Sequence, residues 1–249
     1  MTARIGVRLV GLAAGTAVIA AANVALGRRL AADHRLRERE TAQIHRLRAV
    51  STPARDRLAK QLSTAADVPA SVIHGVAATA LLHRYCGQPR VVARPAIALV
   101  SETLVYLVSG ALVGRERPAV PRLDHEQPTS SFPSGHLGAT VSLAVTYAIL
   151  AGRLSSPAAR AGVRTAAIAW PSLLAWSRIY VGMHFPSDVL VGAANGVATG
   201  LLTAAALADD HPEDAARIFP TAKLTHTRKP SRAGRRIGGK RSERGRAGL

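Results

Sequence analysis

The chain is short of cysteine, aromatic residues and acidic residues. Cys86 is the only cysteine among 249 residues, so an internal disulfide is excluded, and the sequence assigns this residue no role. Aromatic residues make up only 4% of the chain, which leaves Ala, Val, Leu and Gly to carry its apolar content. Acidic residues number 15 against 33 Lys and Arg, and the formal net charge of +18 suits nucleic acid, an anionic membrane surface or an anionic substrate.

Uncharged apolar runs, by contrast, are abundant. A helix needs about 20 residues to cross the hydrocarbon core of a membrane, with a range of about 17 to 25. The fourth and fifth runs, near residues 137–152 and 165–177, look short because Arg153, Arg164 and Arg178 bound them. Both adjoin polar motifs, and a helix can continue through these motifs. We therefore predict an all-α integral membrane bundle of about six transmembrane helices; a soluble all-α protein with buried helices is the alternative. The runs lie near residues 9–27, 65–82, 95–113, 137–152, 165–177 and 189–208.

The sequence divides into four segments, of which two are apolar. Residues 1–27 are expected to form an N-terminal transmembrane helix or signal anchor, because Arg4 and Arg8 precede the apolar run as in a secretory signal, whether cleaved or retained. Residues 65–208 contain the other five runs and are expected to form the main transmembrane helical domain.

The two polar segments differ in composition. Residues 28–64 mix charges with a few spaced apolar residues, which predicts a partly amphipathic helix along the membrane surface or over the domain. Its apolar positions are Leu30, Leu36, Ile44 and Leu47. Residues 209–249 are basic and poor in apolar residues, which is typical of a disordered tail. We expect this tail to contact anionic lipid head groups rather than nucleic acid.

Six spans place both termini on the same side of the membrane. That side then carries 19 Lys and Arg, and the opposite side carries 14. Because cytoplasmic loops collect positive charge, the termini are predicted to be cytoplasmic. Ten of the opposing charges lie in residues 28–64, where four acidic residues accompany them.

The same parity brings three distant polar motifs to one face, which is then extracytoplasmic. GRERP at 114–118 follows the third run, PSGH at 133–136 precedes the fourth, and SRIYVGMHFPSD at 177–188 joins the fifth to the sixth. Because ionisable groups are costly near lipid, such a cluster indicates function. The three motifs are therefore predicted to form one site.

The residue types in these motifs suit phosphate chemistry. Arginine matches phosphate oxygens with a bidentate fork, and a Ser-Gly pair before a helix offers free backbone N–H groups to an anion. His184 and Asp188 are four residues apart, so a helical turn would bring the carboxylate to Nδ1 and leave Nε2 free to attack phosphorus. His136 is the second imidazole, suited to protonate a departing oxygen and then to take a proton from water. Each residue alone also has a structural explanation, such as Asp188 capping its helix, but their combination on one face favours function.

Three ordered motifs resemble those of the type 2 phosphatidic acid phosphatase superfamily, which also contains vanadium-dependent haloperoxidases and glucose-6-phosphatase. They are RP at 117–118, PSGH at 133–136, and Ser177-Arg178 followed by His184 and Asp188 at the family's spacing. The resemblance covers roughly residues 50–208 and implies an all-helical membrane phosphatase without a metal or other cofactor.

The resemblance also implies a role for each motif residue. His184 is implied as the nucleophile that forms a phosphohistidine, Asp188 as its orienting partner, and His136 as the acid on the leaving group. The phosphate oxygens are implied to be bound by Arg117, Arg178, Ser134 and Gly135.

The first motif departs from the family at one position. Where the family has Lys seven residues before Arg117, this chain has Gly110. We hypothesise that Arg115 supplies the missing phosphate-binding cation from a different backbone position. The departure bears on rate and substrate more than on fold.

The leading hypothesis is a membrane phosphatase that acts on a lipid phosphomonoester or diphosphate, with the substrate and the surrounding membrane lipids as its partners. By resemblance the candidates include polyprenyl diphosphate, phosphatidic acid, phosphatidylglycerophosphate and prenyl-linked sugar phosphates, and an extracytoplasmic site favours recycling of a polyprenyl carrier for envelope synthesis. A catalytically weak lipid-phosphate-binding protein is the second hypothesis, because the family's Lys is missing. Vanadate-dependent halide oxidation uses the same pocket but fits a lipid setting poorly.

Overall fold

A computed structural model of the chain describes residues 2–86, 88–125 and 129–209, and the regular structure in these ranges is helical. The prediction made for the basic tail lies outside the described residues from residue 210 onward. The helices are α1 (Thr2–Ala32), α2 (His34–Arg48), α3 (Pro53–Thr64), α4 (Val68–Cys86), α5 (Pro89–Val113), α6 (Gly135–Leu150), the short 3-10 helix η1 (Ala151–Arg153), α7 (Pro157–Tyr180) and α8 (Pro186–Ala206).

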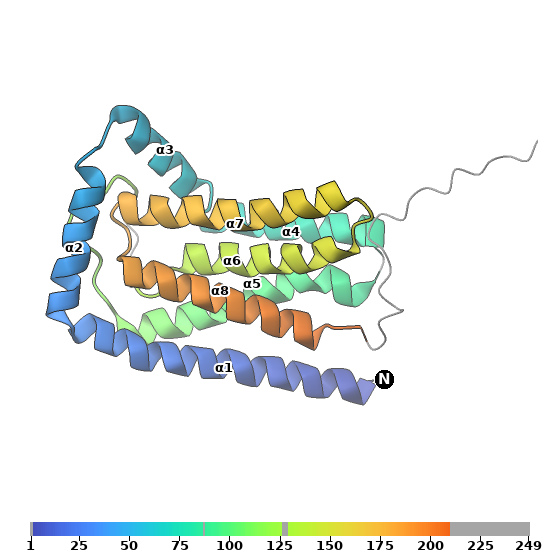
Figure 1. Cartoon of the computed structure of the whole chain (residues 1–249). Helices are drawn as coiled ribbons and strands as arrows, with labels where there is room; N and C mark the ends of the chain where they lie inside the picture. The colour runs from blue at the N-terminus through green and yellow to red at the C-terminus, as the bar shows by residue number, and fades with distance from the viewer. Residues whose placement is uncertain (1, 87, 126–128, 210–249) are drawn as a thin grey trace, which may run out of the picture.

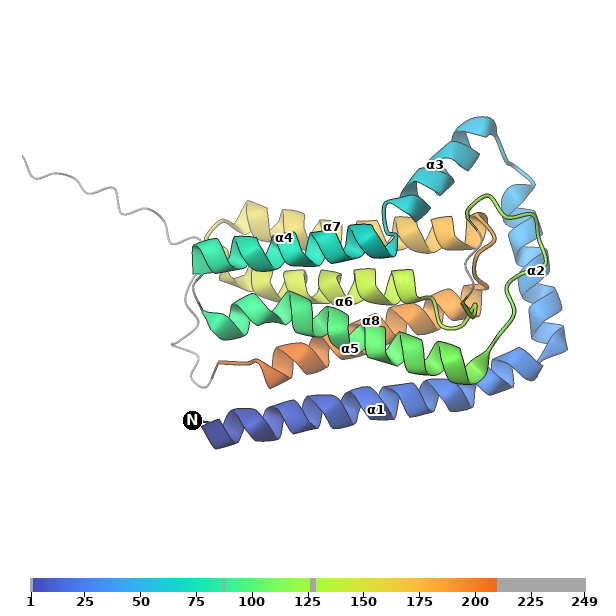
Figure 2. The same cartoon turned by 180° about the vertical axis from the view of Figure 1, so that it is seen from behind.

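Six long helices run side by side, and two shorter ones cover one end of the bundle (Figure 1). The central helix is α6, which packs against α5, α7 and α8, while α1 lies along α5 and α8. Helix α2 stands across the end of the bundle, and α3 slants back toward α7 (Figures 1 and 2). The start of α1 and the end of α8 lie together at the other end, which we call the terminal end; the end covered by α2 is the site end.

Glycines allow α6 and α8 to approach each other closely. Gly192 and Gly196 lie four residues apart on one face of α8. A Cβ on Gly192 would stand 2.4 Å from the Ser134 carbonyl oxygen, and one on Gly196 would stand 2.4 Å from the Gly138 carbonyl oxygen. Close backbone contact through small residues is typical of helices packed within membranes. This contact sets the first turn of α8 directly against the start of α6.

Four described helices are long and apolar enough to cross a membrane: Arg4–Ala32, Pro89–Val113, Gly135–Arg153 and Pro186–Ala206. They correspond to the first, third, fourth and sixth predicted runs. The fourth run looked short in the sequence, but its helix begins inside the PSGH motif and continues into η1. Helices α4 and α7 are not among the helices that are long and apolar enough to cross a membrane, although both run alongside the others. An all-α membrane bundle is therefore supported, whereas the predicted count of six spans stays a proposal.

The polar segment after the first run is more divided than we predicted. Helix α1 extends to Ala32, and residues 34–64 form two helices rather than one. Of the predicted apolar positions, Ile44 is fully buried, whereas Leu30, Leu36 and Leu47 are only half-buried. Ile44 packs against Val120 and Phe185, so α2 lies over the end of the bundle.

Candidate active site

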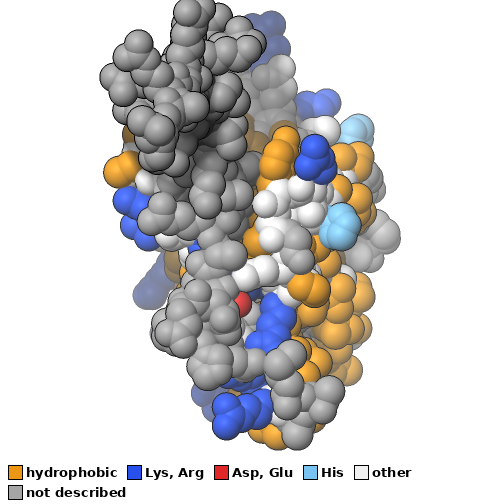
Figure 3. All heavy atoms as spheres, turned by 90° about the vertical axis from the view of Figure 1, so that its right-hand side faces the viewer, with side chains coloured by type: hydrophobic (Ala, Val, Ile, Leu, Met, Phe, Trp, Pro, Cys, Tyr) orange, Lys and Arg blue, Asp and Glu red, His pale blue; other side chains and the backbone are white. Residues whose placement is uncertain are grey.

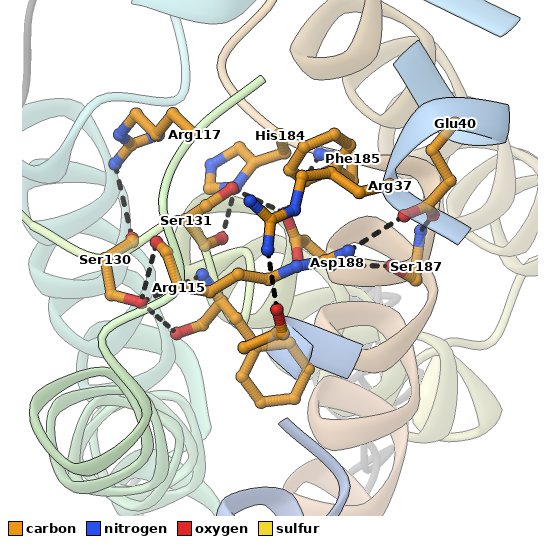
Figure 4. Close-up of polar contacts among 12 residues, drawn as sticks. Arg37, Glu40, Arg115, Arg117, Ser130, Ser131, His184, Phe185, Ser187 and Asp188 are labelled. Atoms are coloured by element: carbon orange, nitrogen blue, oxygen red, sulfur yellow. Dashed lines mark hydrogen bonds and ion pairs between the residues drawn. The ribbon is translucent and has the colours of Figure 1, made fainter. Parts of the chain in front are cut away.

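The three motif segments meet at the site end of the bundle. The Ser134 N–H donates to the Asp188 carbonyl oxygen at 3.0 Å, which joins the second motif to the third. Arg115 Nη1 lies 2.5 Å from Asp188 Oδ1, which joins the first motif to the third. The loop residue Ser131 contacts both Asp188 and His184 (Figure 4). Residues more than 70 positions apart in the sequence thus share one buried centre.

His184 is buried and held in one tautomer. Its Nδ1 lies 2.7 Å from the backbone carbonyl oxygen of Ser131, and since a carbonyl only accepts, Nδ1 carries the proton. Its Nε2 therefore carries a lone pair, which accepts a hydrogen bond from Arg178 Nη2 at 3.4 Å. Burial, together with the positive charges of Arg178 and Arg117, holds the pKa of His184 well below its ordinary value of 6.5. The imidazole is consequently neutral, as a nucleophile requires.

Asp188 does not contact His184 in the way that we expected. Its Oδ2 accepts from the Ser131 hydroxyl at 2.5 Å and from the Phe185 N–H at 2.9 Å. The second of these bonds caps α8, so the structural explanation offered for Asp188 also holds. The partner of Nδ1 is the Ser131 carbonyl, and Ser131 links Asp188 to His184. The expected direct contact was wrong because the turn at Pro186 directs the carboxylate back to its own helix start.

Arg115 is enclosed by acidic groups. Its Nη2 lies 2.9 Å from Glu40 Oε2, its Nη1 contacts Asp188, and its guanidinium stacks 4.4 Å from the centre of the Phe185 ring (Figure 4). The side chain is 2% exposed. Both terminal nitrogens are thus occupied by carboxylates, which argues against our hypothesis that Arg115 replaces the missing phosphate-binding Lys.

The other two arginines remain close to His184. Arg117 Nη1 donates to the Met183 carbonyl oxygen at 2.6 Å, and Nη2 donates to the neutral oxygens of Thr129 and Ser130. Arg178 is fully buried, and its Nη1 contacts Asp124 Oδ2 at 3.1 Å and the Ser63 hydroxyl. Its Nη2 points to His184. Arg178 therefore lies next to Nε2 of His184 and is partly neutralised by a carboxylate, and Arg117 binds the carbonyl of the residue before His184.

His136 begins α6 and has an acidic partner from another part of the chain. Its Nε2 lies 3.2 Å from Oδ1 of Asp67, in the turn between α3 and α4. Burial and the nearby charge of Asp124 raise the pKa of Asp67. His136 is also close enough for its charge to affect His184. The second imidazole thus lies at the same end of the bundle as the first and is paired with a partly exposed carboxylate.

Ser134 and Gly135 form the start of α6. The Ser134 hydroxyl is buried, and in the described structure it has no hydrogen-bond partner. A Cβ on Gly135 would lie 2.7 Å from the Tyr106 ring, so only glycine fits there. An unpartnered hydroxyl at a helix N-terminus is a suitable donor for an anion.

Sequence reasoning missed several polar residues of the site. Ser131 and Asp124 lie in the loop before α6, close enough to PSGH to have been suspected. Glu40 and Asp67 lie far from any motif, and the sequence pattern gave no sign that their carboxylates reach the site. Glu40 is four residues before Ile44, so it shares the face of α2 that packs on the bundle. Within the described ranges, no group of three His, Cys, Asp or Glu side chains is placed to hold a metal ion.

The fold and the site together define a class. An all-α membrane bundle that gathers two imidazoles, two guanidiniums and a helix N-terminus at one end is a membrane protein with a buried, polar and cationic centre. Residues 92–211 match the model of the PAP2 superfamily, and the chain belongs to this superfamily. The matched region contains the three motifs but excludes α1 to α4, and with them Glu40 and Asp67.

Related sequences and structures agree with this assignment. A decaprenylphosphoryl-5-phosphoribose phosphatase of Mycobacterium tuberculosis is 34% identical over 108 residues, which is 42% of this chain and 54% of that protein. A lipid A 1-phosphatase of Rhizobium johnstonii is 39% identical over 74 residues, 30% of this chain and 27% of that protein. The chain thus spans about half, or less, of the length of these relatives. The crystal structure of a transmembrane PAP2-type phosphatidylglycerolphosphate phosphatase from Bacillus subtilis has a TM-score of 0.64 at 21% identity, over 78% of this chain and 92% of that one, which shows a shared fold.

Proposed function

We propose that this protein is a membrane lipid phosphatase that hydrolyses a lipid phosphomonoester or diphosphate through a phosphohistidine at His184. The observation that carries the proposal is the tautomer of His184: its Nδ1 proton is bound to the Ser131 carbonyl, so the Nε2 lone pair faces the space beside Arg178. A neutral imidazole held in this way is a nucleophile for phosphorus.

The reaction follows in two steps. Nε2 of His184 attacks phosphorus and forms a P–N bond while the P–O bond to the lipid breaks, and His136 gives a proton to the departing oxygen. Water then attacks the phosphohistidine, His136 takes a proton from this water, and the P–N bond breaks to release inorganic phosphate. Arg117 and Arg178 stabilise the charge on the equatorial oxygens, and the Ser134 hydroxyl with the first N–H groups of α6 binds another oxygen.

Asp124 has to be accounted for in this scheme, because it lies against Arg178 where a phosphate oxygen would bind. It leaves Nη2 of Arg178 directed at His184, so one guanidinium nitrogen stays available to the phosphoryl group. The carboxylate also keeps the buried Arg178 compensated before substrate enters. We infer that the incoming phosphate shares Arg178 with Asp124.

A lipid substrate is favoured by an apolar cavity that starts beside the site. The cavity has a volume of about 560 Å³ and lies between α4, α6 and α7. It extends from Ala66, next to the Asp67 that contacts His136, toward Leu154 near the terminal end. The two named relatives act on a decaprenyl-linked sugar phosphate and on lipid A. We propose that the cavity holds the hydrocarbon tail and that the head group reaches the histidines.

The proposed topology has six spans, because α4 and α7 run the length of the bundle beside the four qualifying helices. The terminal end faces the cytoplasm in this proposal. Figure 3 looks onto that end, and the charged side chains that it shows in colour are mostly Lys and Arg. The site end is then extracytoplasmic, and a reporter fused after residue 209 tests the orientation by its activity in the cytoplasm.

The function is tested with the full chain purified in detergent and a panel of phosphatidic acid, phosphatidylglycerophosphate and polyprenyl phosphates and diphosphates, scored for inorganic phosphate. We expect release from at least one lipid phosphate and a loss of about 10³-fold or more in His184→Ala. His45→Ala, which changes an exposed histidine on α2, is the control. Full activity in His184→Ala would rule out the phosphohistidine.

A weak lipid-phosphate-binding protein is the second candidate, and Gly110 is the observation that favours it. Arg115 is occupied by carboxylates, so the charge of the family's Lys is not replaced from that position. In this case wild type binds lipid phosphate at the same site, and turnover is absent across the panel.

A further inference from the structure

One face of helix α2 packs against the third motif and forms hydrogen bonds with it. Glu40, Ile44 and Arg48 are spaced four residues apart, so they lie in a row along the helix. Ile44 is fully buried against Phe185, and Arg48 Nε donates to the Tyr180 carbonyl oxygen at 2.6 Å. The row therefore holds the loop of residues 181–185 from the end of α7 to the start of α8.

Glu40 makes the contact nearest to the chemistry. It is 4% exposed, although it belongs to a helix that is otherwise mostly polar and solvent-facing. Its Oε1 accepts the Ser187 N–H at 2.7 Å, and its Oε2 lies 2.9 Å from Arg115 Nη2. One carboxylate thus satisfies a free N–H in the first turn of α8 and one side of a buried guanidinium.

A continuous row of hydrogen bonds leads from Glu40 to the nucleophile (Figure 4). Arg115 bridges Glu40 and Asp188, with Nη1 2.5 Å from Asp188 Oδ1. Asp188 holds the hydroxyl of Ser131, and the carbonyl of Ser131 accepts the Nδ1 proton of His184. The direction of the Nε2 lone pair therefore depends on a row of contacts that ends at Glu40 on α2.

We infer that Glu40 is a positioning residue for phosphoryl transfer, acting through Arg115, Asp188 and Ser131 on His184. The inference rests on the proposed function. Glu40 touches neither phosphate-binding arginine in the described contacts, so its effect falls on the attack and not on substrate binding. Without the carboxylate, Arg115 keeps Asp188 but loses its second anchor, and the first turn of α8 loses an acceptor. A shift of about 1 Å at a reacting group costs on the order of 10²-fold in rate, so a partial loss of order costs about tenfold.

The experiment compares Glu40→Gln with Glu38→Gln, an exposed glutamate on the same helix. Steady-state kinetics are measured on the full chain with a short-chain lipid phosphate, at a temperature where thermal unfolding shows each variant to be folded. We expect Glu40→Gln to lower kcat about tenfold with KM within about twofold of wild type. Glu38→Gln is expected to match wild type. If Glu40→Gln does not fold, Glu40→Asp, which keeps the charge but shortens the side chain, is measured by the same criteria.

A double-variant cycle separates positioning from simple stabilisation. If Glu40 acts through Arg115, Glu40→Gln should have little further effect on kcat in an Arg115→Gln background. A folded Glu40→Gln protein with wild-type kcat, or one in which only KM rises, would overturn the inference.

Orthovanadate gives a reading that does not need turnover, because it resembles the transition state of phosphoryl transfer. Its affinity, measured by calorimetry, should fall about tenfold in Glu40→Gln and stay unchanged in Glu38→Gln. Equal affinity in all three proteins counts against positioning. A wild type that releases no phosphate defeats the proposed function alone, and the vanadate affinities then decide the role of Glu40.

Discussion

Arginine side chains lie at both ends of helix α8, but their hydrogen-bond and ion-pair partners differ. At the terminal end, Arg94 Nη2 donates to the Leu207 carbonyl oxygen at 2.8 Å, and Arg8 Nη1 donates to the Ala208 carbonyl oxygen at 2.9 Å. The first bond satisfies the carbonyl of the C-cap residue of α8, which the helix leaves unpaired, and the second binds the carbonyl of the next residue. At the site end, Arg115 and Arg178 instead contact carboxylates and a histidine.

The difference shows that burial and charge do not by themselves mark a functional arginine. Arg94 is 4% exposed and Arg178 is fully buried, so exposure hardly separates them. Their partners distinguish the two arginines. A backbone carbonyl at a helix C-terminus requires only a donor, whereas a neutral imidazole beside a guanidinium leaves a position where an anion can bind. Arginines at the terminal end should therefore affect stability, and those at the site end should affect activity.

The same conservative substitution at both ends gives the sharpest test of this comparison. Arg178→Lys keeps the charge opposite Asp124 but loses the second guanidinium nitrogen, which faces His184. We expect kcat/KM to fall about 10²-fold, the usual cost of removing one transition-state donor. Arg94→Lys should leave the activity of the folded protein unchanged and lower its thermal unfolding midpoint. Phosphate release and thermal unfolding in detergent measure both, and similar activity losses in the two variants would contradict the comparison.

Adding a cation should also act differently at the two ends. A Cβ on Gly110 would lie 3.6 Å from the Phe132 carbonyl oxygen and 3.8 Å from Ser130 Cβ, so the backbone accepts a Cβ there at ordinary contact distances. Gly110→Lys restores the family's first-motif charge and is expected to raise kcat/KM about tenfold, as a charge-assisted contact to phosphate would.

Two controls belong to this experiment. Gly110→Met has a similar length without the charge and should give no gain. Gly152→Lys adds the same charge at the terminal end, where a Cβ meets nothing within 4 Å, and should also leave kcat/KM unchanged. An equal gain from both lysines would indicate a general electrostatic attraction of the substrate.

The site was more predictable than the groups that hold it in place. Helix parity was sufficient to bring the three motifs together, because each motif adjoins the end of an apolar run. The direct contact of Asp188 with His184 was mispredicted, because spacing along a helix gives distance but not which group a side chain selects, and the carboxylate partners of Arg115 were not foreseen. Glu40 and Asp67 were missed altogether, since the packing of α2 and the turn before α4 depends on tertiary contacts that no local pattern contains.

The apolar cavity joins the two ends, so its blockage tests whether the substrate tail uses it. Ala167 on α7 lines the cavity, and Ala167→Trp should fill part of it. We expect kcat/KM to fall about fivefold or more for a long-chain lipid phosphate, because tail burial contributes about 0.8 kcal/mol per CH₂, while a short-chain substrate is hardly affected. Ile168→Trp changes the neighbouring residue, which is 71% exposed, and serves as the control. Equal loss for both chain lengths would place the tail elsewhere.

The smallest expected effect concerns pH, and only a change at the site end should produce it. His184 must be unprotonated to attack, and burial, Arg178 and Arg117 hold its pKa well below 6.5. Activity should therefore persist as the pH falls through 6.5 and be lost only at more acidic pH. Arg117→Gln removes one of the positive charges that lower this pKa, so the acid limb of kcat/KM should move to higher pH. Arg94→Gln removes a charge from the terminal end and should leave the limb in place. The profile is read by its midpoint and not by its height, because Arg117→Gln also slows the reaction. An acid limb that stays fixed in Arg117→Gln would mean that a group other than His184 sets it.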